Sequence, residues 1–198
     1  MSLAAARALG LDEVWWLVSP GNPLKPKAGM APYAARFASA QRQARRSIIR
    51  VSDIERRLGI VYTVDTLRAL DLRFPRHRFI WLMGADTVAQ FHHWKDWRRL
   101  AATVPIAVLS RPGYEGRART ARVSGWFRRF VRPGAQACEW TRWSAPAIVF
   151  LRLTPDRTSA TQLRAADPLW HERFARNTDA GSSVIDSANH RRNLVRHP

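Results

Sequence analysis

Several short polar stretches in this sequence could bind a phosphorylated ligand, and one of them directly follows an apolar run. Gly84-Ala85-Asp86 comes after the apolar residues 79–83. Glycine lets a ligand approach the backbone closely, and a carboxylate can accept hydrogen bonds from ribose hydroxyls. The alternative is an ordinary turn from a strand into a helix, with Asp86 as the N-cap residue. The tripeptide alone does not separate the two interpretations.

A second stretch, residues 157–164, predicts a helix start that is rich in hydroxyl groups. Ser159 and Gln162 fit a capping box, which is the structural interpretation. A helix start also presents free backbone N–H groups and the positive end of its dipole to an anion. Because Thr161 and Arg164 stand close by in the sequence, the same stretch could form a phosphate site.

Two further stretches combine aromatic residues with a helix start or with histidines. Residues 62–66, Tyr-Thr-Val-Asp-Thr, predict a helix start whose amides could hold a carboxylate, with simple capping as the alternative. In residues 91–97 the adjacent His92 and His93 would point in different directions on a helix, so no metal site is expected there. Trp94 and Trp97 have the spacing of one buried helix face, although Trp94 could instead stack on a planar ring.

The elements that must position these groups follow from the apolar periodicity. Apolar runs predict strands, and the segments between them predict helices. The expected strands are 14–18, 47–51, 79–83, 105–109 and 147–153, and the expected helices are 2–9, 32–46, 63–70, 94–101 and 159–166. This alternation predicts an α/β fold, a Rossmann-like, doubly wound and mostly parallel sheet with helices on both faces. Such sheets bind ligands beyond the carboxyl ends of their strands, where the polar stretches above lie.

Some regions are less regular. The first strand, 14–18, is expected to be buried on both faces. Residues 19–27 predict a proline-stiffened loop with two lysines, and residues 110–114 a tight turn that carries Arg111. Residues 114–143 show no clear periodicity and predict loop with irregular helix. One domain is expected over 1–176, followed by a polar, disordered tail over 177–198.

Composition narrows the class of protein. The formal net charge is +18, which favours anionic ligands, but the arginines are spread along the whole chain rather than gathered in one block. We therefore expect a solvated basic surface rather than a nucleic-acid groove. The single Cys138 suits a reducing compartment, and no apolar stretch has the length of a membrane span. A cytoplasmic protein with no membrane partner is expected.

Taken in order, the motifs resemble those of bacterial nicotinate-nucleotide adenylyltransferases, which are members of the nucleotidyltransferase superfamily. The matching segments are WWLVSPGNPLKPK, VSDIE, YTVDTL, FIWLMGADTVAQFHHWKDW, IAVLSRPGY and TSATQLR, within about residues 2–166. The resemblance implies an enzyme that transfers the adenylyl group of ATP to nicotinate mononucleotide. The products would be nicotinate adenine dinucleotide and pyrophosphate, in NAD biosynthesis, with Mg²⁺ accompanying ATP.

The resemblance also implies roles for particular residues. Gly84 and Asp86 would face the ribose and adenine of ATP. The ATP phosphates would be held by Ser159, Thr161 and Arg164, of which Ser159 and Arg164 would be catalytic. Thr63, through its backbone, and Trp94, by stacking, would recognise the nicotinate ring and its carboxylate. Less specifically, Arg111 would line the ATP side of the site, and Asn22 and Lys25 the side of the nicotinate nucleotide.

One departure from the family pattern concerns the start of the chain. The family begins with a strand and a Gly-Gly-x-Phe-x-Pro-x-His-x-Gly-His turn, whose histidines bind ATP phosphates, whereas Met1-Ser2-Leu3 corresponds to the helix after that turn. We therefore expect that a first, central strand is missing beside the strand ending at Gly84. The 198-residue chain is expected to be weakly active or inactive, and a chain extended upstream to be active.

Two other functions stay open at this point. One is a different small-molecule nucleotidyltransferase of the same superfamily, such as phosphopantetheine adenylyltransferase. The other is a non-catalytic, basic nucleic-acid-binding protein, which the net charge of +18 would suit. The second alternative leaves the ordered series of motifs unexplained.

Overall fold

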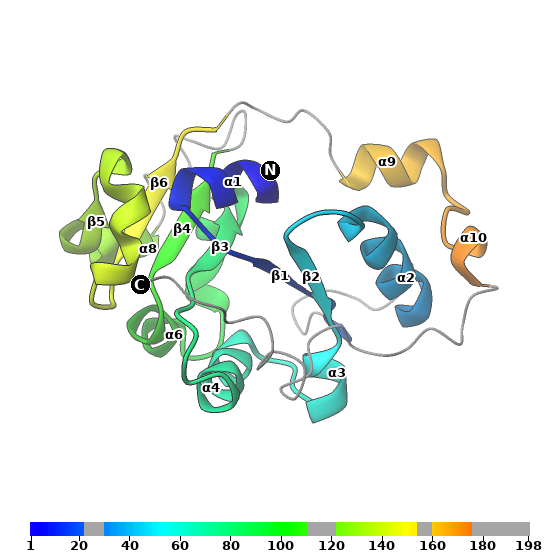
Figure 1. Ribbon diagram of the computed structural model, residues 1–198, viewed down its shortest axis with the longest axis horizontal. Coiled ribbons are helices and arrows are strands. Elements are labelled where there is room, and N and C mark those ends of the chain that lie inside the picture. Colours follow the sequence, from blue (N-terminus) through cyan, green and yellow to red (C-terminus); the bar gives the residue numbers. More distant parts are fainter. Residues whose placement is uncertain (22–29, 111–121, 154–159, 176–198) are drawn as a thin grey trace. The chain divides into compact units, whose positions relative to one another are not determined.

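The computed structural model describes residues 1–21, 30–110, 122–153 and 160–175, and these fall into two compact units (Figure 1). The first unit comprises Met1–Asp12 and Tyr62–Arg157, and the second comprises Glu13–Val61 and Thr158–Pro198. Each unit contains its own parallel sheet. The expected tail over 177–198 lies outside the described residues.

The sheet of the first unit has four parallel strands in the order β3-β4-β6-β5. The long strands align in register, so that Gly84 pairs with Leu109 and Leu109 with Leu151 at their carboxyl ends. The strands are β3 (Trp81–Gly84), β4 (Ile106–Leu109), β6 (Ile148–Leu151) and the two-residue β5 (Val131–Arg132). This arrangement places the ends of β3, β4 and β6 along one edge of the sheet.

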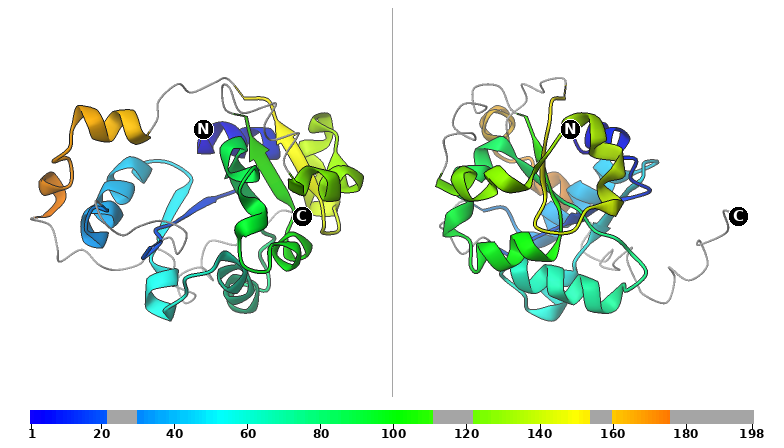
Figure 2. Two further views of the ribbon diagram at one scale, coloured as in Figure 1. Left: turned by 180° about the vertical axis from the view of Figure 1, so that it is seen from behind. Right: turned by 90° about the vertical axis from the view of Figure 1, so that its left-hand side faces the viewer.

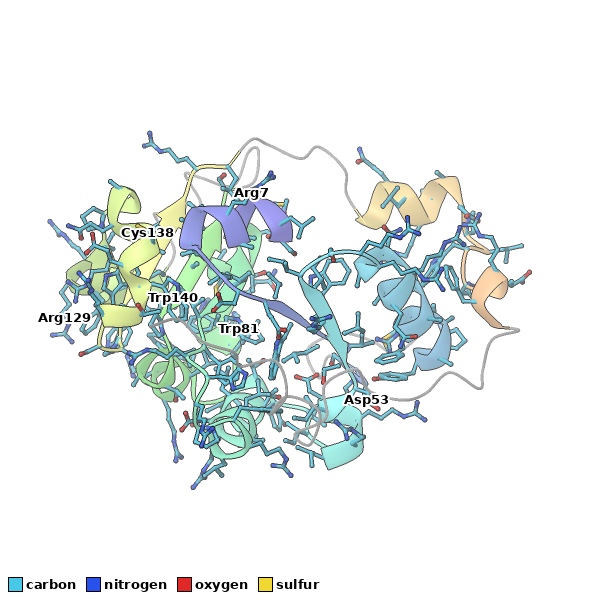
Figure 3. All side chains as sticks on the ribbon, viewed as in Figure 1. Arg7, Asp53, Trp81, Arg129, Cys138 and Trp140 are labelled. Carbon is cyan, nitrogen blue, oxygen red and sulfur yellow. The ribbon has the colours of Figure 1, made fainter. Side chains whose placement is uncertain are left out.

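One face of this sheet is covered by α1 (Ser2–Leu9) and the 3-10 helix η3 (Gly134–Arg142). Gly10 ends α1 in the left-handed conformation, with φ of 63°. The indole Nε1 of the buried Trp140 donates a hydrogen bond of 3.0 Å to the carbonyl of Leu9 (Figure 3). The cluster joins α1 and η3 to alternate residues of β4 and β6: Ala5, Leu9, Ala107, Leu109, Ala137, Trp140, Val149 and Leu151.

The opposite face of the sheet is also buried. Ile106, Val108 and Ile148 point away from α1 because side chains alternate along a strand, and each is at most 1% exposed. The remaining helices of the unit include α4 and α6, which pack against each other (Figure 2). They are α4 (Thr63–Arg73), α5 (Ala85–Val88), η1 (Phe91–His93), α6 (Trp97–Thr103), α8 (Arg122–Phe127) and η2 (Arg128–Phe130). The doubly covered parallel sheet confirms the expected fold class.

The second unit is built on a pair of parallel strands, β1 (Val14–Leu17) and β2 (Ile49–Ser52). Its helices are α2 (Tyr33–Ala44), α3 (Ile54–Leu58), α9 (Ala160–Ala166) and α10 (Glu172–Ala175). Two guanidinium groups lie over the Tyr33 ring, with Arg56 at 4.6 Å and Arg36 at 5.3 Å from its centroid. Burial, reinforced by the charge of Asp53, raises the pKa of Tyr33 to about 12, so the phenol stays neutral at physiological pH.

Several expectations about elements were wrong. The first strand is not buried on both faces, because residues 15–17 are half-buried and only Val14 is buried. The helix expected at 94–101 begins at Trp97, since Asp96 has a φ of 48° and interrupts it. Residues 114–143 were expected to be loop with irregular helix, and their described part, from Arg122 onward, does contain the helices α8, η2 and η3. The strand β5 in this region and the helix α3 were not expected.

The strands also form two sheets rather than one. Among the described residues, β1 pairs with β2 alone and β3 pairs with β4 alone, so β1 and β3 are each an edge strand of their sheet. The resemblance expects an additional strand beside β3, and that expectation stays a prediction.

Candidate functional site

The carboxyl end of β3 turns sharply into a short helix. Gly84 is the last residue of β3 and the N-cap of α5, with extended φ and ψ of −74° and 153°. Asp86 lies in the first turn of α5 and is half-buried, so the alternative interpretation, with Asp86 as the N-cap residue, was wrong. Its neighbours Ala85 and Val88 are buried and anchor the turn. A half-buried carboxylate after a parallel strand can accept hydrogen bonds from hydroxyl groups of a ligand.

The predicted helix start at Thr63 is confirmed. Tyr62 is the N-cap of α4 and makes no side-chain capping hydrogen bond. The backbone amides of Asp65 and Thr66 both donate to the carbonyl of Tyr62, at 3.0 and 3.1 Å. The amides of the first two helical residues, Thr63 and Val64, therefore precede the bonded ladder and carry the positive end of an 11-residue helix. Such a helix start can receive a carboxylate or a phosphate.

Trp94 lies in the same unit, directly after η1 and in extended conformation. Its ring centroid is 5.4 Å from that of Phe91, which is fully buried, and 6.4 Å from that of Trp81 on β3. Trp97 contacts the other side of this cluster, 6.0 Å from Phe91. The expectation that Trp94 and Trp97 share one buried helix face was wrong, because Trp94 precedes α6 and both side chains are only partly buried. Both rings do contact Phe91, and the partly exposed Trp94 is able to contact a ligand.

Lys95 connects the Trp94 segment to the start of α4, a link that the sequence interpretation missed. Its Nζ lies 3.3 Å from Oδ2 of Asp65 and 4.5 Å from the centroid of the Tyr62 ring. Lys95 and Asp65 are 30 positions apart, so no local spacing signals the contact. The contact between Lys95 and Asp65 joins two predicted site elements, the helix start at Thr63 and the segment that carries the partly exposed Trp94.

At the ends of β4 and β6 a serine joins the two strands. The hydroxyl of Ser110 accepts a hydrogen bond of 3.2 Å from the amide of Leu153. The amide of Ser110 donates to the carbonyl of Leu151 at 3.1 Å. Arg111, in the turn expected over 110–114, lies outside the described residues, as do Asn22, Lys25 and Ser159.

The remaining predicted residues lie on α9 in the second unit. Thr161 belongs to α9 by its backbone, and Arg164 is an exposed residue in the last turn of that helix. The helix expected at 159–166 is thus confirmed from Ala160 onward. Gly84, Asp86, Thr63 and Trp94 all lie in the first unit.

Arg36 is a second residue that the sequence interpretation missed. Its Nη1 donates to the carbonyl of Ser19 at 2.7 Å, and its Nε donates to the carbonyl of Ala31 at 3.1 Å. Burial lowers the pKa of Arg36 from its ordinary value, although the guanidinium stays charged. One side chain thus fixes the backbone on both sides of the segment that carries Asn22 and Lys25.

The described ranges contain no candidate metal cluster and no candidate membrane span. No group of three or more His, Cys, Asp or Glu side chains in those ranges is arranged to hold a metal ion. His92 and His93 contact each other, with ring centroids 3.9 Å apart. No helix in the described part of the chain is long and apolar enough to cross a membrane.

Comparison with known proteins supports one family. The cytidylyltransferase-like family matches residues 2–166. The protein named "Probable nicotinate-nucleotide adenylyltransferase" from Erythrobacter litoralis is 55% identical over 174 residues, which cover 88% of this chain and 80% of that protein. Proteins of the same name from Parvibaculum lavamentivorans and Gluconobacter oxydans are 52% and 51% identical, over 80% and 81% of this chain and 79% and 82% of theirs. The chain therefore belongs to the cytidylyltransferase-like family, in which its relatives are named nicotinate-nucleotide adenylyltransferases.

Proposed function

We propose that this protein transfers the adenylyl group of ATP to nicotinate mononucleotide, forming nicotinate adenine dinucleotide and pyrophosphate in NAD biosynthesis. The observation that carries the proposal is the identity of 55% over 88% of the chain with a relative named for this reaction. The geometry of the first unit supports it, since a carboxylate after β3 and an uncapped helix start lie in one compact unit.

The chemistry needs no covalent intermediate. A phosphate oxygen of nicotinate mononucleotide attacks the α-phosphorus of ATP, the bond from that phosphorus to the bridging oxygen breaks, and pyrophosphate leaves. Catalysis of such a step consists of holding the reactants in line and offsetting negative charge on the phosphoryl oxygens. Mg²⁺ would reach the site with ATP, because in such sites it is held largely by substrate phosphates and water.

On the ATP side, we assign Gly84 and Asp86 to the nucleoside. The extended backbone at Gly84 and the half-buried carboxylate of Asp86 suit a ribose that lies against the end of β3. The phosphates are assigned to Ser159, Thr161 and Arg164, and Arg111 is assigned to ATP as well. Arg164 is exposed on α9, so its guanidinium is available to an anionic ligand.

On the acceptor side, we assign the nicotinate ring to Trp94 and its carboxylate to the amides at the start of α4, beginning at Thr63. The contact of Lys95 with Asp65 supports this assignment, because it ties the two elements together. Asn22 and Lys25 are assigned to the nucleotide part of the acceptor, and the hydrogen bonds of Arg36 hold the backbone on both sides of them. We propose the cytoplasm as the location, since the substrates are soluble metabolites.

The reaction itself is tested by supplying the purified protein with ATP, Mg²⁺ and nicotinate mononucleotide. We expect pyrophosphate to appear together with a dinucleotide of the mass of nicotinate adenine dinucleotide. ATP without an acceptor serves as the control. Pyrophosphate release that does not depend on the acceptor, or a product of another mass, would count against the proposal.

Replacing Trp94 with alanine is expected to raise the KM for nicotinate mononucleotide by about 5- to 150-fold, because stacking on an aromatic ring is worth roughly 1–3 kcal/mol per base. The KM for ATP should change little. Trp94→Phe should recover much of the loss, since it keeps a ring that can stack.

Trp97→Ala is the matched control, because it removes a ring from the same cluster around Phe91. It should lower stability without raising the acceptor KM comparably. Initial rates at varied concentrations of each substrate separate the two effects. If Trp94→Ala raised both KM values equally, the stacking role would be wrong.

A further inference from the structure

We propose that Lys95 is a specificity-determining residue, which favours the anionic carboxylate of nicotinate over the neutral carboxamide of nicotinamide by offsetting the charge of Asp65 at the start of α4. The inference rests on the proposed function, which brings the nicotinate carboxylate to the amides at that helix start. It adds an explanation of charge selectivity, carried by the contacts of Lys95.

Asp65 places a negative charge at the start of α4, where the nicotinate carboxylate is proposed to bind. It is the third residue of α4, and its backbone amide bonds back to the carbonyl of Tyr62. An acidic residue in the first turn interacts favourably with the helix dipole. A bound carboxylate would use the same positive helix end, however, and two like charges at one helix start repel each other. Left alone, Asp65 would therefore weaken the binding of an anion there.

Lys95 places a positive charge at this position. Its Nζ is 3.3 Å from Oδ2 of Asp65, and it lies 4.5 Å from the centroid of the ring of Tyr62, the N-cap residue of α4. The ammonium of Lys95 thus contacts both Asp65 in the first turn and Tyr62, the N-cap residue. The side chains of Lys95 and Asp65 are each 46% exposed, so water screens the pair and its effect on overall stability is small.

The charge of the ligand decides what the loss of Lys95 does. A nicotinate carboxylate would meet the uncompensated charge of Asp65 and bind less tightly. The carboxamide of nicotinamide mononucleotide, which takes the place of that carboxylate, carries no charge, so binding of this ligand would be weakened much less. If Lys95 only held the Trp94 segment against α4, its loss would instead weaken the binding of both ligands equally. Charge selectivity therefore separates the two explanations.

The test compares the Kd of nicotinate mononucleotide with that of nicotinamide mononucleotide by titration calorimetry at low ionic strength. The Lys95→Met variant retains an unbranched apolar side chain of similar length and loses the charge. We expect nicotinate mononucleotide to bind about 3- to 10-fold more weakly and nicotinamide mononucleotide to change by less than about 2-fold, as suits a charge interaction at a half-exposed site.

Two further variants make the outcome decisive. Adding Asp65→Asn to Lys95→Met should restore the preference for nicotinate mononucleotide, because the uncompensated charge is removed. Arg68→Ala is the matched control, since it deletes an exposed positive charge from the same helix, and it should leave the preference unchanged. Equal weakening of both ligands by Lys95→Met, or no rescue by Asp65→Asn, would overturn the inference.

Failure of the proposed function would look different. In that case the wild-type protein itself would show no preference for nicotinate mononucleotide, before any variant is measured. A wild-type preference that Lys95→Met leaves intact would overturn the role of Lys95 alone.

Discussion

Replacing Arg164 with alanine is expected to lower kcat for pyrophosphate release by about 10²–10³-fold, the effect typical of removing one donor that stabilises transition-state charge. Arg164 lies in the last turn of α9 and is exposed, so its removal should not disturb a core. If its guanidinium meets the ATP phosphates, the loss acts mainly on the charge that develops as pyrophosphate leaves. Initial-rate measurements at saturating ATP and acceptor give the change in kcat directly.

Arg173→Ala provides a control in the same unit. Arg173 is an exposed arginine on α10 that forms an ion pair with Asp167, and exposed pairs of this kind contribute little to stability. This variant should keep kcat within about twofold of the wild type, as expected for a surface substitution away from the site. If Arg164→Ala and Arg173→Ala behaved alike, Arg164 would have no role in the reaction.

Replacing Trp140 with alanine is expected to lower the free energy of unfolding by about 3–5 kcal/mol, the usual cost of truncating a buried tryptophan. Trp140 is 6% exposed and packs among residues of α1, β4 and β6. Its indole also donates the hydrogen bond to the carbonyl of Leu9, so the variant leaves a buried acceptor without this donor. The loss of packing and the loss of the hydrogen bond both weaken the contact between η3 and α1 on one face of the sheet.

Trp140→Phe separates the two contributions, because phenylalanine keeps most of the packing and cannot donate the hydrogen bond. It should cost about 1–3 kcal/mol, the penalty for an unsatisfied buried group. Urea unfolding followed by circular dichroism gives both values. A Trp140→Ala variant as stable as the wild type would contradict the packing described for this face of the sheet.

Strand β4 could be predicted because burial on both faces leaves a continuous apolar run. Ile106–Leu109 is buried at every position, and the sequence shows this directly. The two-residue β5 could not be predicted, since Val131 and Arg132 are both exposed and owe their conformation to pairing with β6. Local sequence carries no signal for a pairing of this kind.

Parts of the candidate site could not be predicted from the sequence either. The turns at Gly84 and Thr63 could be placed because each opens a helix after a recognisable boundary. The prediction that Trp94 belongs to a helix over 94–101 was wrong, because Asp96 adopts a left-handed conformation that a helical pattern does not reveal. The contact of Lys95 with Asp65 joins residues far apart in sequence, and only the packing of the fold brings them together.

The most direct test of the account compares acceptors at fixed ATP and Mg²⁺. Nicotinate mononucleotide, nicotinamide mononucleotide and phosphopantetheine are each supplied to the purified protein, and kcat/KM for pyrophosphate release is measured for all three. We predict the highest value for nicotinate mononucleotide. A higher value for phosphopantetheine would contradict the proposed function and place the protein with another small-molecule nucleotidyltransferase.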